Sequence, residues 1–182
     1  MCSSDLGGRV TPHQRFGTAK WRLPRELATA CGWTVLDFVM SRSESYARPA
    51  ALPVVRRAAI RDDLLRRDFT INTLAICLDA KRAGRVLDFC GGAADLQQRQ
   101  INVLHSRSFA DDPTRMLRAV RFAERLSCEL SPGTLQLIEP ACAHVVALSG
   151  DRLRHELQFV LEEKHPASVL AQIGRASCRE RV

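Results

Sequence analysis

The spacing of apolar residues divides the chain into a first part with short strands and a second part with helices. Runs rich in β-formers predict strands within residues 10–20, 34–40, 85–89 and 101–104. From residue 108 onward, apolar residues recur three and four positions apart, which predicts helices only. Pro132 and Pro140 interrupt this helical pattern, and Ser149 starts its last helix.

Three connections between these elements are predicted to lack helices and strands of their own. Residues 23–32 form a short connection, because Pro24 does not fit the interior of a helix. Residues 41–57 form a mobile loop with prolines and a basic end. The double glycine Gly91-Gly92 is predicted to be the turn of a hairpin-like excursion between the two strands that flank it.

A further helix is predicted from an apolar stripe, whose members are Ile71, Leu74, Ala75 and Leu78. Asp68 and Asn72 lie one turn apart, so both side chains are expected on one face. An acceptor and an amide beside Arg66 and Arg67 suit a sugar hydroxyl next to a phosphate. The alternative is a plain helix start, with Asp68 as the cap and solvated arginines.

A second polar cluster stands where the helical part begins. Asp112 is predicted to cap a helix that has Pro113 at its first position. Asp112 and Arg115 are three apart and are expected to project side by side. The aspartate accepts from the exocyclic amine of C or A, and the arginine donates to a ring acceptor, so the pair rejects U and G. The alternative is an ordinary cap with a salt bridge.

The same helix has a basic face, formed by Arg115, Arg118, Arg121 and Arg125. Two interpretations are open: the face binds the acceptor end of an RNA, or it is merely solvated. The last helix carries Arg152 and Arg154. Within the strand at 34–40, Asp37 is costly unless it is paired, binds a cation or lies on the solvated face.

Composition adds weak constraints. The net charge of +7 and the pI near 9.4 favour a polyanionic partner. Five of the seven cysteines lie between residues 7 and 172, without metal-binding spacing, and are predicted to be buried, reduced thiols of a cytoplasmic protein. No apolar run approaches the roughly 18 residues of a membrane span.

The two ends of the chain are expected to be foreign to it. Residues 2–6 and 173–176 can be encoded by stretches that are reverse complements of each other, which is typical of translated sequencing adapter. We therefore expect residues 1–6 and 173–182 to be artefacts and the gene to be cut on both sides.

Three motifs resemble those of the class II tRNA nucleotidyltransferases, the family of CCA-adding enzymes and bacterial poly(A) polymerases. Arg66-Arg67-Asp68-Phe69-Thr70-Ile71-Asn72 is similar to its ribose-reading motif. The segment from Leu87 to Leu96 is similar to its Asp-Pro-x-Gly-Gly-x-x-Asp-Leu motif, with Cys90 as a departure, and Asn102 stands further on where arginine is frequent. Asp111–Arg115 is similar to its Glu-Asp-x-x-Arg motif, with aspartate in place of glutamate.

The resemblance implies an α+β fold. Residues 7–107 would form a truncated, polymerase beta-like nucleotidyltransferase head with a mixed β-sheet, and residues 108–172 an all-α neck and the start of a body. The implied reaction is template-independent addition of C and A from CTP and ATP to the 3′ end of tRNA. Poly(A) addition is the nearest alternative, and a non-catalytic RNA-binding protein is the other.

The resemblance also implies roles for individual residues. Nucleotide binding would fall to Arg67, Asp68, Asn72, Asp112, Arg115, Arg118 and Arg121, and RNA binding to Arg125, Arg152 and Arg154. Mg²⁺ would serve as cofactor, but the family's Gly-Gly-x-x-Arg-Asp and Asp-x-Asp segments are missing. Asp37 is the one candidate for a metal-binding, catalytic carboxylate. We therefore expect the chain by itself to be inactive.

Overall fold

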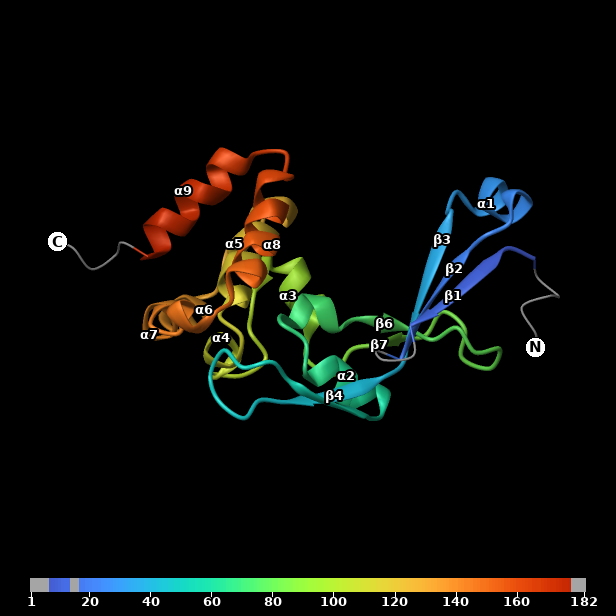
Figure 1. Cartoon of the computed structure of the whole chain (residues 1–182), viewed down its shortest axis with the longest axis horizontal. Helices are drawn as coiled ribbons and strands as arrows, with labels where there is room; N and C mark the ends of the chain where they lie inside the picture. The colour runs from blue at the N-terminus through green and yellow to red at the C-terminus, as the bar shows by residue number, and fades with distance from the viewer. Residues whose placement is uncertain (1–6, 14–16, 178–182) are drawn as a thin grey trace. The chain divides into compact units, whose positions relative to one another are not determined.

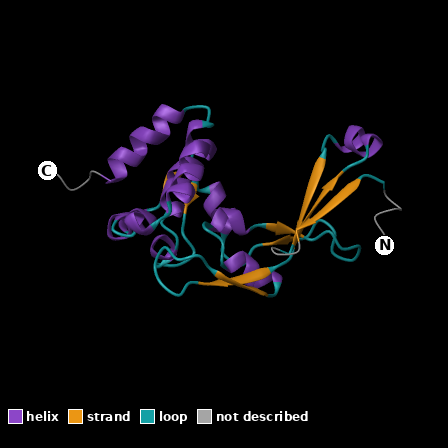
Figure 2. Ribbon diagram, viewed as in Figure 1, coloured by secondary structure: helices purple, strands orange, loops and turns teal. Residues whose placement is uncertain are grey.

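The computed structural model describes residues 7–13 and 17–177. The described ranges leave out residues 1–6 and 178–182, which belong to the two predicted artefacts. They also leave out residues 14–16, which belong to the strand predicted within 10–20. The chain splits into two compact units, residues 1–42 and 43–182, and each is described by itself. Figures 1 and 2 show strands with a short helix in the first unit and mainly helices in the second.

The first unit is a three-stranded antiparallel sheet in the order β1 (Arg9–His13), β2 (Thr18–Arg22), β3 (Val35–Val39). The strand predicted at 34–40 is confirmed. The connection at 23–32 was predicted wrongly, because it contains the helix α1 (Arg25–Cys31). Pro24 stands at its N-cap, where a missing N–H costs no intrahelical hydrogen bond.

The second unit begins with a two-stranded ribbon of β4 (Arg42–Ser45) and β5 (Val54–Arg57). The prediction of a mobile loop at 41–57 is therefore wrong at both of its ends. Ionic and backbone contacts hold the segment: Glu44 pairs with Arg66 at 2.7 Å, and the backbone N–H of Ala50 donates to Ala110 at 3.1 Å.

The helix predicted through Ile71 and Leu78 is wrong. The chain forms α2 (Ile60–Leu65), an extended residue at Phe69 and a 3-10 turn, η2 (Thr70–Thr73). It then enters β6 (Ala75–Ile76), which pairs with β7 (Val86–Leu87), and Leu78 is 89% exposed. The reason is that Phe69 bridges to Val103 and Thr70 donates its backbone N–H to Asn102, so the segment that follows β8 (Gln100–Ile101) takes bonds that a helix needs.

The predicted hairpin around Gly91-Gly92 is also wrong. The double glycine leads into the helix α3 (Gly92–Gln97), and the strand after it, β8 (Gln100–Ile101), pairs in parallel with β9 (Glu129–Leu130). Asp88 stabilises the start of α3, because its carboxylate accepts from the backbone N–H groups of Cys90, Gly92 and Ala93.

Helices dominate the remainder, as predicted, apart from β9. They are α4 (Ser108–Asp111), α5 (Thr114–Leu126), α6 (Pro132–Gln136), α7 (Ile138–Cys142), the 3-10 turn η3 (Val145–Ala147), α8 (Gly150–Leu161) and α9 (Pro166–Ser177). Ser149 caps α8 through a hydrogen bond from Arg152 N–H. No helix in the described ranges combines the length and the apolar character that a membrane crossing needs.

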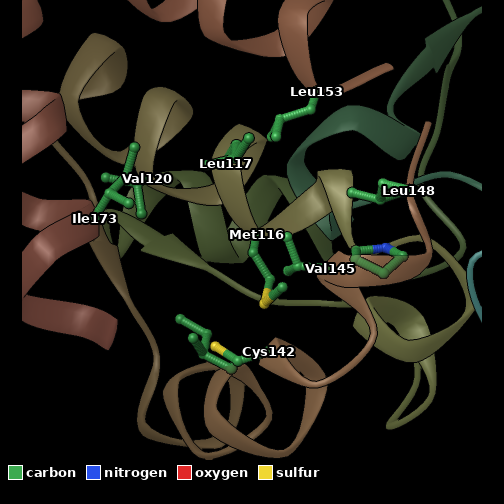
Figure 3. A pocket seen from close by; sticks show the side chains of 10 residues that line it. Met116, Leu117, Val120, Cys142, Val145, Leu148, Leu153 and Ile173 are labelled. Carbon is green, nitrogen blue, oxygen red and sulfur yellow. The ribbon is translucent and has the colours of Figure 1, made fainter. Parts of the chain in front are cut away.

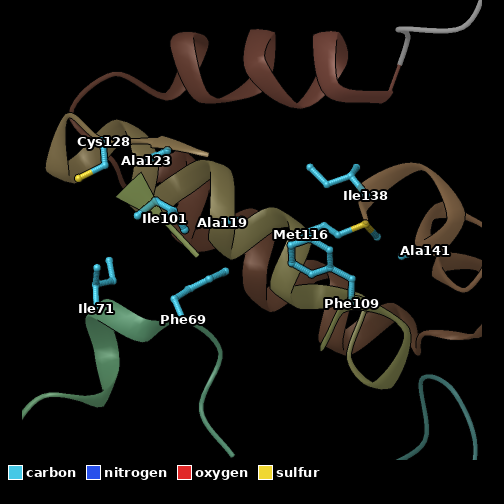
Figure 4. Packing of buried hydrophobic residues seen from close by; sticks show 10 residues of the cluster. All are labelled: Phe69, Ile71, Ile101, Phe109, Met116, Ala119, Ala123, Cys128, Ile138 and Ala141. Atoms are coloured by element: carbon cyan, nitrogen blue, oxygen red, sulfur yellow. The ribbon is translucent and has the colours of Figure 1, made fainter. Parts of the chain in front are cut away.

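The core of the second unit forms around α5, as Figure 4 shows. Phe69 and Ile101 are fully buried in it, together with Ala119 of α5. Burial of a side chain the size of Phe69 contributes about 2 kcal/mol. The segment predicted to read a sugar is therefore anchored to the same core as α5.

Burial of the cysteines was predicted wrongly for most of them. Only Cys128 is buried among the cysteines that the structure describes, whereas Cys31 and Cys142 are exposed. Apolar neighbours in sequence misled the prediction, because the helices α1 and α7 that carry these two thiols turn them outward.

Gly92 allows α3 to approach the backbone of η2. A Cβ at Gly92 would lie 2.9 Å from the carbonyl carbon of Thr70 and overlap its oxygen. We expect Gly92→Ala to lower the free energy of unfolding by about 2 kcal/mol, because backbone cannot move aside as a side chain can. Urea denaturation measures the change. Gly133→Ala is the matched control, since nothing lies within 4 Å of a Cβ there. Equal losses in both variants contradict this account of Gly92.

Candidate functional site

Asp68 is buried, and its carboxylate is saturated with hydrogen-bond donors. Its Oδ1 accepts from the side-chain amide of Asn72 at 3.0 Å and from the backbone N–H of Phe69 at 2.9 Å. Its Oδ2 accepts from Nε of Arg118 at 2.9 Å and from Nη2 of the same guanidinium. A carboxylate has about four acceptor sites, so these donors fill it. The sequence predicted Asp68 beside Asn72, and the structure adds Arg118 to the group.

The ionisation of Asp68 follows from these contacts. Burial raises its pKa, but the Arg118 guanidinium, the Asn72 amide and the Phe69 N–H outweigh burial and hold the pKa below its usual range. The group is therefore charged at neutral pH. Because a carboxylate only accepts, the Asn72 amide must turn Nδ2 toward it. Its Oδ1 then accepts from no residue in the described part of the chain.

The two arginines before the buried aspartate differ in role. Arg66 has a structural role, because its guanidinium forms ion pairs with Glu44 at 2.7 Å and with Asp63 at 2.8 Å. The side chain of Arg67 is 39% exposed and is held by Asp63 at 3.3 Å and by the backbone oxygen of Asn72 at 2.8 Å. Arg67 is thus the arginine that reaches solvent next to Asn72.

Arg115 joins the start of α5 to this segment. The residue is only 6% exposed. Its Nη1 donates to the Ser108 hydroxyl at 2.9 Å and to the backbone oxygen of Arg67 at 3.4 Å, and its Nη2 donates to the backbone oxygen of Arg66 at 3.1 Å. The two motifs that the sequence singled out are therefore in direct contact, although 48 residues separate Arg115 from Arg67.

One carboxylate oxygen of Asp112 accepts hydrogen bonds within the unit, and the other is open to a ligand. Its Oδ1 accepts from the backbone N–H of Thr114 at 3.0 Å, from the Thr114 hydroxyl at 2.6 Å and from Nη2 of Arg152 at 2.7 Å. No residue that the structure describes donates to its Oδ2. The prediction of Asp112 as the cap with Pro113 at the first helical position is wrong by one residue, because α5 begins at Thr114 and has Pro113 at its N-cap. Asp112 still accepts from the first N–H of α5, and its side chain is 20% exposed. Asp112 is an oriented acceptor with one open oxygen.

The basic face of α5 is not merely solvated, because acidic side chains pair with it. That it binds the acceptor end of an RNA stays a prediction. Glu156 of α8 lies 3.6 Å from Arg118 and 3.9 Å from Arg121. Glu163, just beyond α8, lies 3.5 Å from Arg121 and also pairs with Arg125. Most of this charge is therefore neutralised inside the unit. No local pattern in the sequence indicates this, because the partners lie 35 positions away or more.

The remaining predicted residues lie apart from this group or at its margin. Arg152 donates from Nη2 to Asp112 and from Nη1 to the backbone oxygen of Ala50 at 3.2 Å, so both of its terminal nitrogens already have acceptors within the unit. Arg154 is exposed and pairs with Asp151 on the surface. Asp37 belongs to the first unit, where its side chain is 64% exposed and lies 3.5 Å from Lys20 on the neighbouring strand.

The described residues do not fit a metal site. They contain no cluster of three histidine, cysteine, aspartate or glutamate side chains that could hold an ion. Asp37 has a lysine as its charged neighbour, and a cation competes with it for the carboxylate. The metal-binding role of Asp37 stays a prediction.

Two side chains near the site were missed by the sequence analysis. Glu44 fixes Arg66 and accepts from the Tyr46 hydroxyl at 3.1 Å. The phenol of Tyr46 is within electrostatic range of Arg115 and Asp112, and burial, above all, raises its pKa to about 12. Both residues belong to the segment 41–57 that was predicted to be a loop, and no local pattern indicates the proximity of Tyr46 to Arg115 and Asp112.

A cavity of about 330 Å³ lies on another side of α5. Its lining is apolar and includes Met116, Val120 and Leu153 (Figure 3). It offers none of the donors and acceptors that a nucleotide needs, so the candidate site is the polar group around Asp68 and Asp112.

The fold and these motifs agree with the comparisons. The family model for the poly A polymerase head domain matches residues 5–102, and the chain belongs to this family. The solved structure titled "The structure of CCA-adding enzyme apo form II" is 37% identical, covers 96% of this chain and superposes with a TM-score of 0.86. The predicted α+β nucleotidyltransferase head is thereby confirmed.

Curated relatives show the same similarity. An A-adding tRNA nucleotidyltransferase of Geobacter sulfurreducens is 41% identical over 94% of this chain, and one of Halalkalibacterium halodurans is 41% identical over 92%. The chain spans 19% and 39% of the lengths of these two relatives, and 40% of the solved structure.

Proposed function

We propose that the protein containing this chain adds A, C or both to the 3′ end of tRNA, using ATP and CTP without a template. The observation that carries this proposal is Asp112, whose Oδ1 is fixed by three donors and whose Oδ2 has no donor among the described residues. An oriented acceptor beside an arginine suits the exocyclic amine of A or C and repels the carbonyl that U and G present there.

The residues of this chain then divide the nucleotide among them. Asp112 and Arg115 read the base, and Arg67 meets the phosphates from its exposed position. Asp68 has no acceptor site left, so we assign the ribose hydroxyl to Oδ1 of Asn72, with Asp68 holding the amide in place. Residues 7–107 are proposed as the head and 108–172 as the neck.

The metal is left outside this division of roles. Mg²⁺ is proposed as the cofactor of the whole protein, as the family resemblance implies, and the cytoplasm as its location. Because the described residues do not form an ion site, no step of the proposal passes through the metal.

The experiment uses the full-length protein and two tRNAs, one lacking CCA and one ending in CC, with each nucleotide offered singly. Incorporation of one A on the CC-ended tRNA supports A addition, which the names of the relatives favour. Incorporation of CTP supports CC or CCA addition, and long A tails support poly(A) synthesis instead. RNA binding without incorporation of any nucleotide overturns the proposal and supports a non-catalytic RNA-binding protein.

A further inference from the structure

The arginines of α5 alternate with carboxylates in a continuous chain of ion pairs. It runs from Asp68 to Arg118, then to Glu156, Arg121 and Glu163. The two glutamates come from α8 and the turn after it, a part of the sequence to which no role in nucleotide binding has been given. The chain of ion pairs therefore connects the sugar-reading segment to α8.

Glu156 occupies a particular place in this chain. The residue is 7% exposed and stands between two guanidinium groups, Arg118 at 3.6 Å and Arg121 at 3.9 Å. Its Oε2 is buried without a hydrogen bond from any described residue, so it meets Arg121 only at ion-pair distance. Such a carboxylate restrains the position of its arginines more than it stabilises the fold.

The two edges of the Arg118 guanidinium face opposite partners. Nε and Nη2 donate to Asp68, and Nη1 faces Glu156. Arg118 also lies 5.6 Å from the ring centre of Phe122, which supports it from the side. Glu156 therefore binds the edge of the Arg118 guanidinium opposite Asp68, and it fixes the positions of the Nε and Nη2 donors of Arg118 relative to Asp68.

We propose that Glu156 is a positioning residue for recognition of the ribose. It holds Arg118, Arg118 holds Asp68, and Asp68 turns the amide of Asn72 so that Oδ1 faces the sugar. The inference rests on the proposed function, and it adds α8 to the elements that set the choice between ribonucleotides and deoxyribonucleotides.

Glu163 supplies a matched control on the same side of α5. It also pairs with two arginines, Arg121 at 3.5 Å and Arg125, and its side chain is 8% exposed, against 9% for Glu156. It has no contact with Arg118 or Asp68 among the described residues. Neutralising either glutamate removes a buried charge between two arginines, but only Glu156 contacts Arg118 directly, and Glu163 lies two ion pairs further along the chain.

The test measures binding of ATP and of 2′-deoxy-ATP to the full-length protein by calorimetry. We expect Glu156→Gln to reduce the ratio of the two affinities by about tenfold, as for a misdirected charge-assisted hydrogen bond. Glu163→Gln is expected to leave the ratio within about twofold of wild type. Glu156→Asp restores the charge at shorter reach and is expected to recover part of the ratio. Thermal unfolding of each variant checks that the protein is folded.

The outcomes separate this inference from the proposed function. Equal effects of Glu156→Gln and Glu163→Gln on the ratio, or an unchanged ratio in both, overturn the positioning role. A wild-type protein that binds both nucleotides equally well, or neither, overturns it too. A wild-type protein that prefers ATP in binding but incorporates no nucleotide into tRNA contradicts the proposed function alone. If Glu156→Gln does not fold, Arg118→Lys serves as the second variant, and an unchanged ratio there also overturns the inference.

Discussion

Arg115→Ala is expected to abolish most of the selection between A or C and G or U in nucleotide incorporation by the full-length protein. A pair of contacts to one base edge, here from Asp112 and Arg115, contributes about 1–3 kcal/mol of discrimination, so losing the pair costs about tenfold to 100-fold in selection. The variant also leaves the backbone oxygens of Arg66 and Arg67 without their donor. Each such buried group costs about 1–3 kcal/mol, so we expect a stability loss near the upper end of this range.

The controls for Arg115 distinguish selection from stability. Arg115→Lys keeps the charge but loses the planar fork, so it is expected to recover stability in part and selection hardly at all. Arg125→Ala removes an arginine of the same helix whose side chain is 49% exposed, and it is expected to cost less than about 1 kcal/mol without affecting selection. Single-nucleotide incorporation and urea denaturation measure the two effects. Unchanged base preference in Arg115→Ala contradicts our placement of the base.

Arg118→Ala is expected to lower the free energy of unfolding by about 3 kcal/mol at neutral pH, because it leaves Asp68 buried and charged without its cation. The side chain of Arg118 is 31% exposed, so solvent screening places the value at the lower end of the range for buried pairs. The same variant is expected to bind ATP and 2′-deoxy-ATP with more similar affinities, since Asp68 no longer holds Asn72 in one orientation.

The loss in Arg118→Ala should depend on pH in a defined direction. In the wild-type chain the pKa of Asp68 is depressed, so its contribution to stability is present above the unfolded-state pKa and is lost as the pH falls through the folded-state pKa. Without Arg118, burial raises the pKa of Asp68 with less to oppose it. Protonation of Asp68 then removes the buried charge and restores part of the stability of the variant. The difference between the two proteins is therefore expected to shrink as the pH falls toward about 4.

The double variant Asp68→Asn/Arg118→Met supplies the control for this pair. It removes both charges, so no buried ion is left alone, and it is expected to be more stable than Arg118→Ala. Urea denaturation at several pH values measures all of these differences. A loss in Arg118→Ala that is constant with pH contradicts the assigned role of Asp68.

Local chemistry in the sequence predicted the content of the site better than its geometry. The spacing of Asp68 and Asn72 indicated that they lie together, and they do, but through a 3-10 turn instead of a helix. The helix was predicted wrongly because Phe69 and Thr70 bond to the segment at Asn102–Val103, which no local pattern reveals. Tertiary pairing overrode helical periodicity here.

Charge pairing across distant elements was the other feature beyond reach of the sequence. Four arginines at helical spacing predicted a basic face on α5, but Glu156 and Glu163 neutralise much of it. The connection at 23–32 failed for a similar reason. Pro24 was interpreted as excluding a helix there, but it stands at the N-cap of α1, where proline is tolerated. Periodicity reveals which residues share a face, and contacts decide what that face meets.

Photo-crosslinking tests the central claim most directly, that Asp112 and Arg115 hold the base of the incoming nucleotide. The full-length protein is labelled with 8-azido-ATP, and the labelled peptide is identified by mass spectrometry. We predict label within residues 108–118, with protection by ATP or CTP and little protection by GTP or UTP. Label confined to other parts of the chain, or protection that is equal for all four nucleotides, would contradict the account.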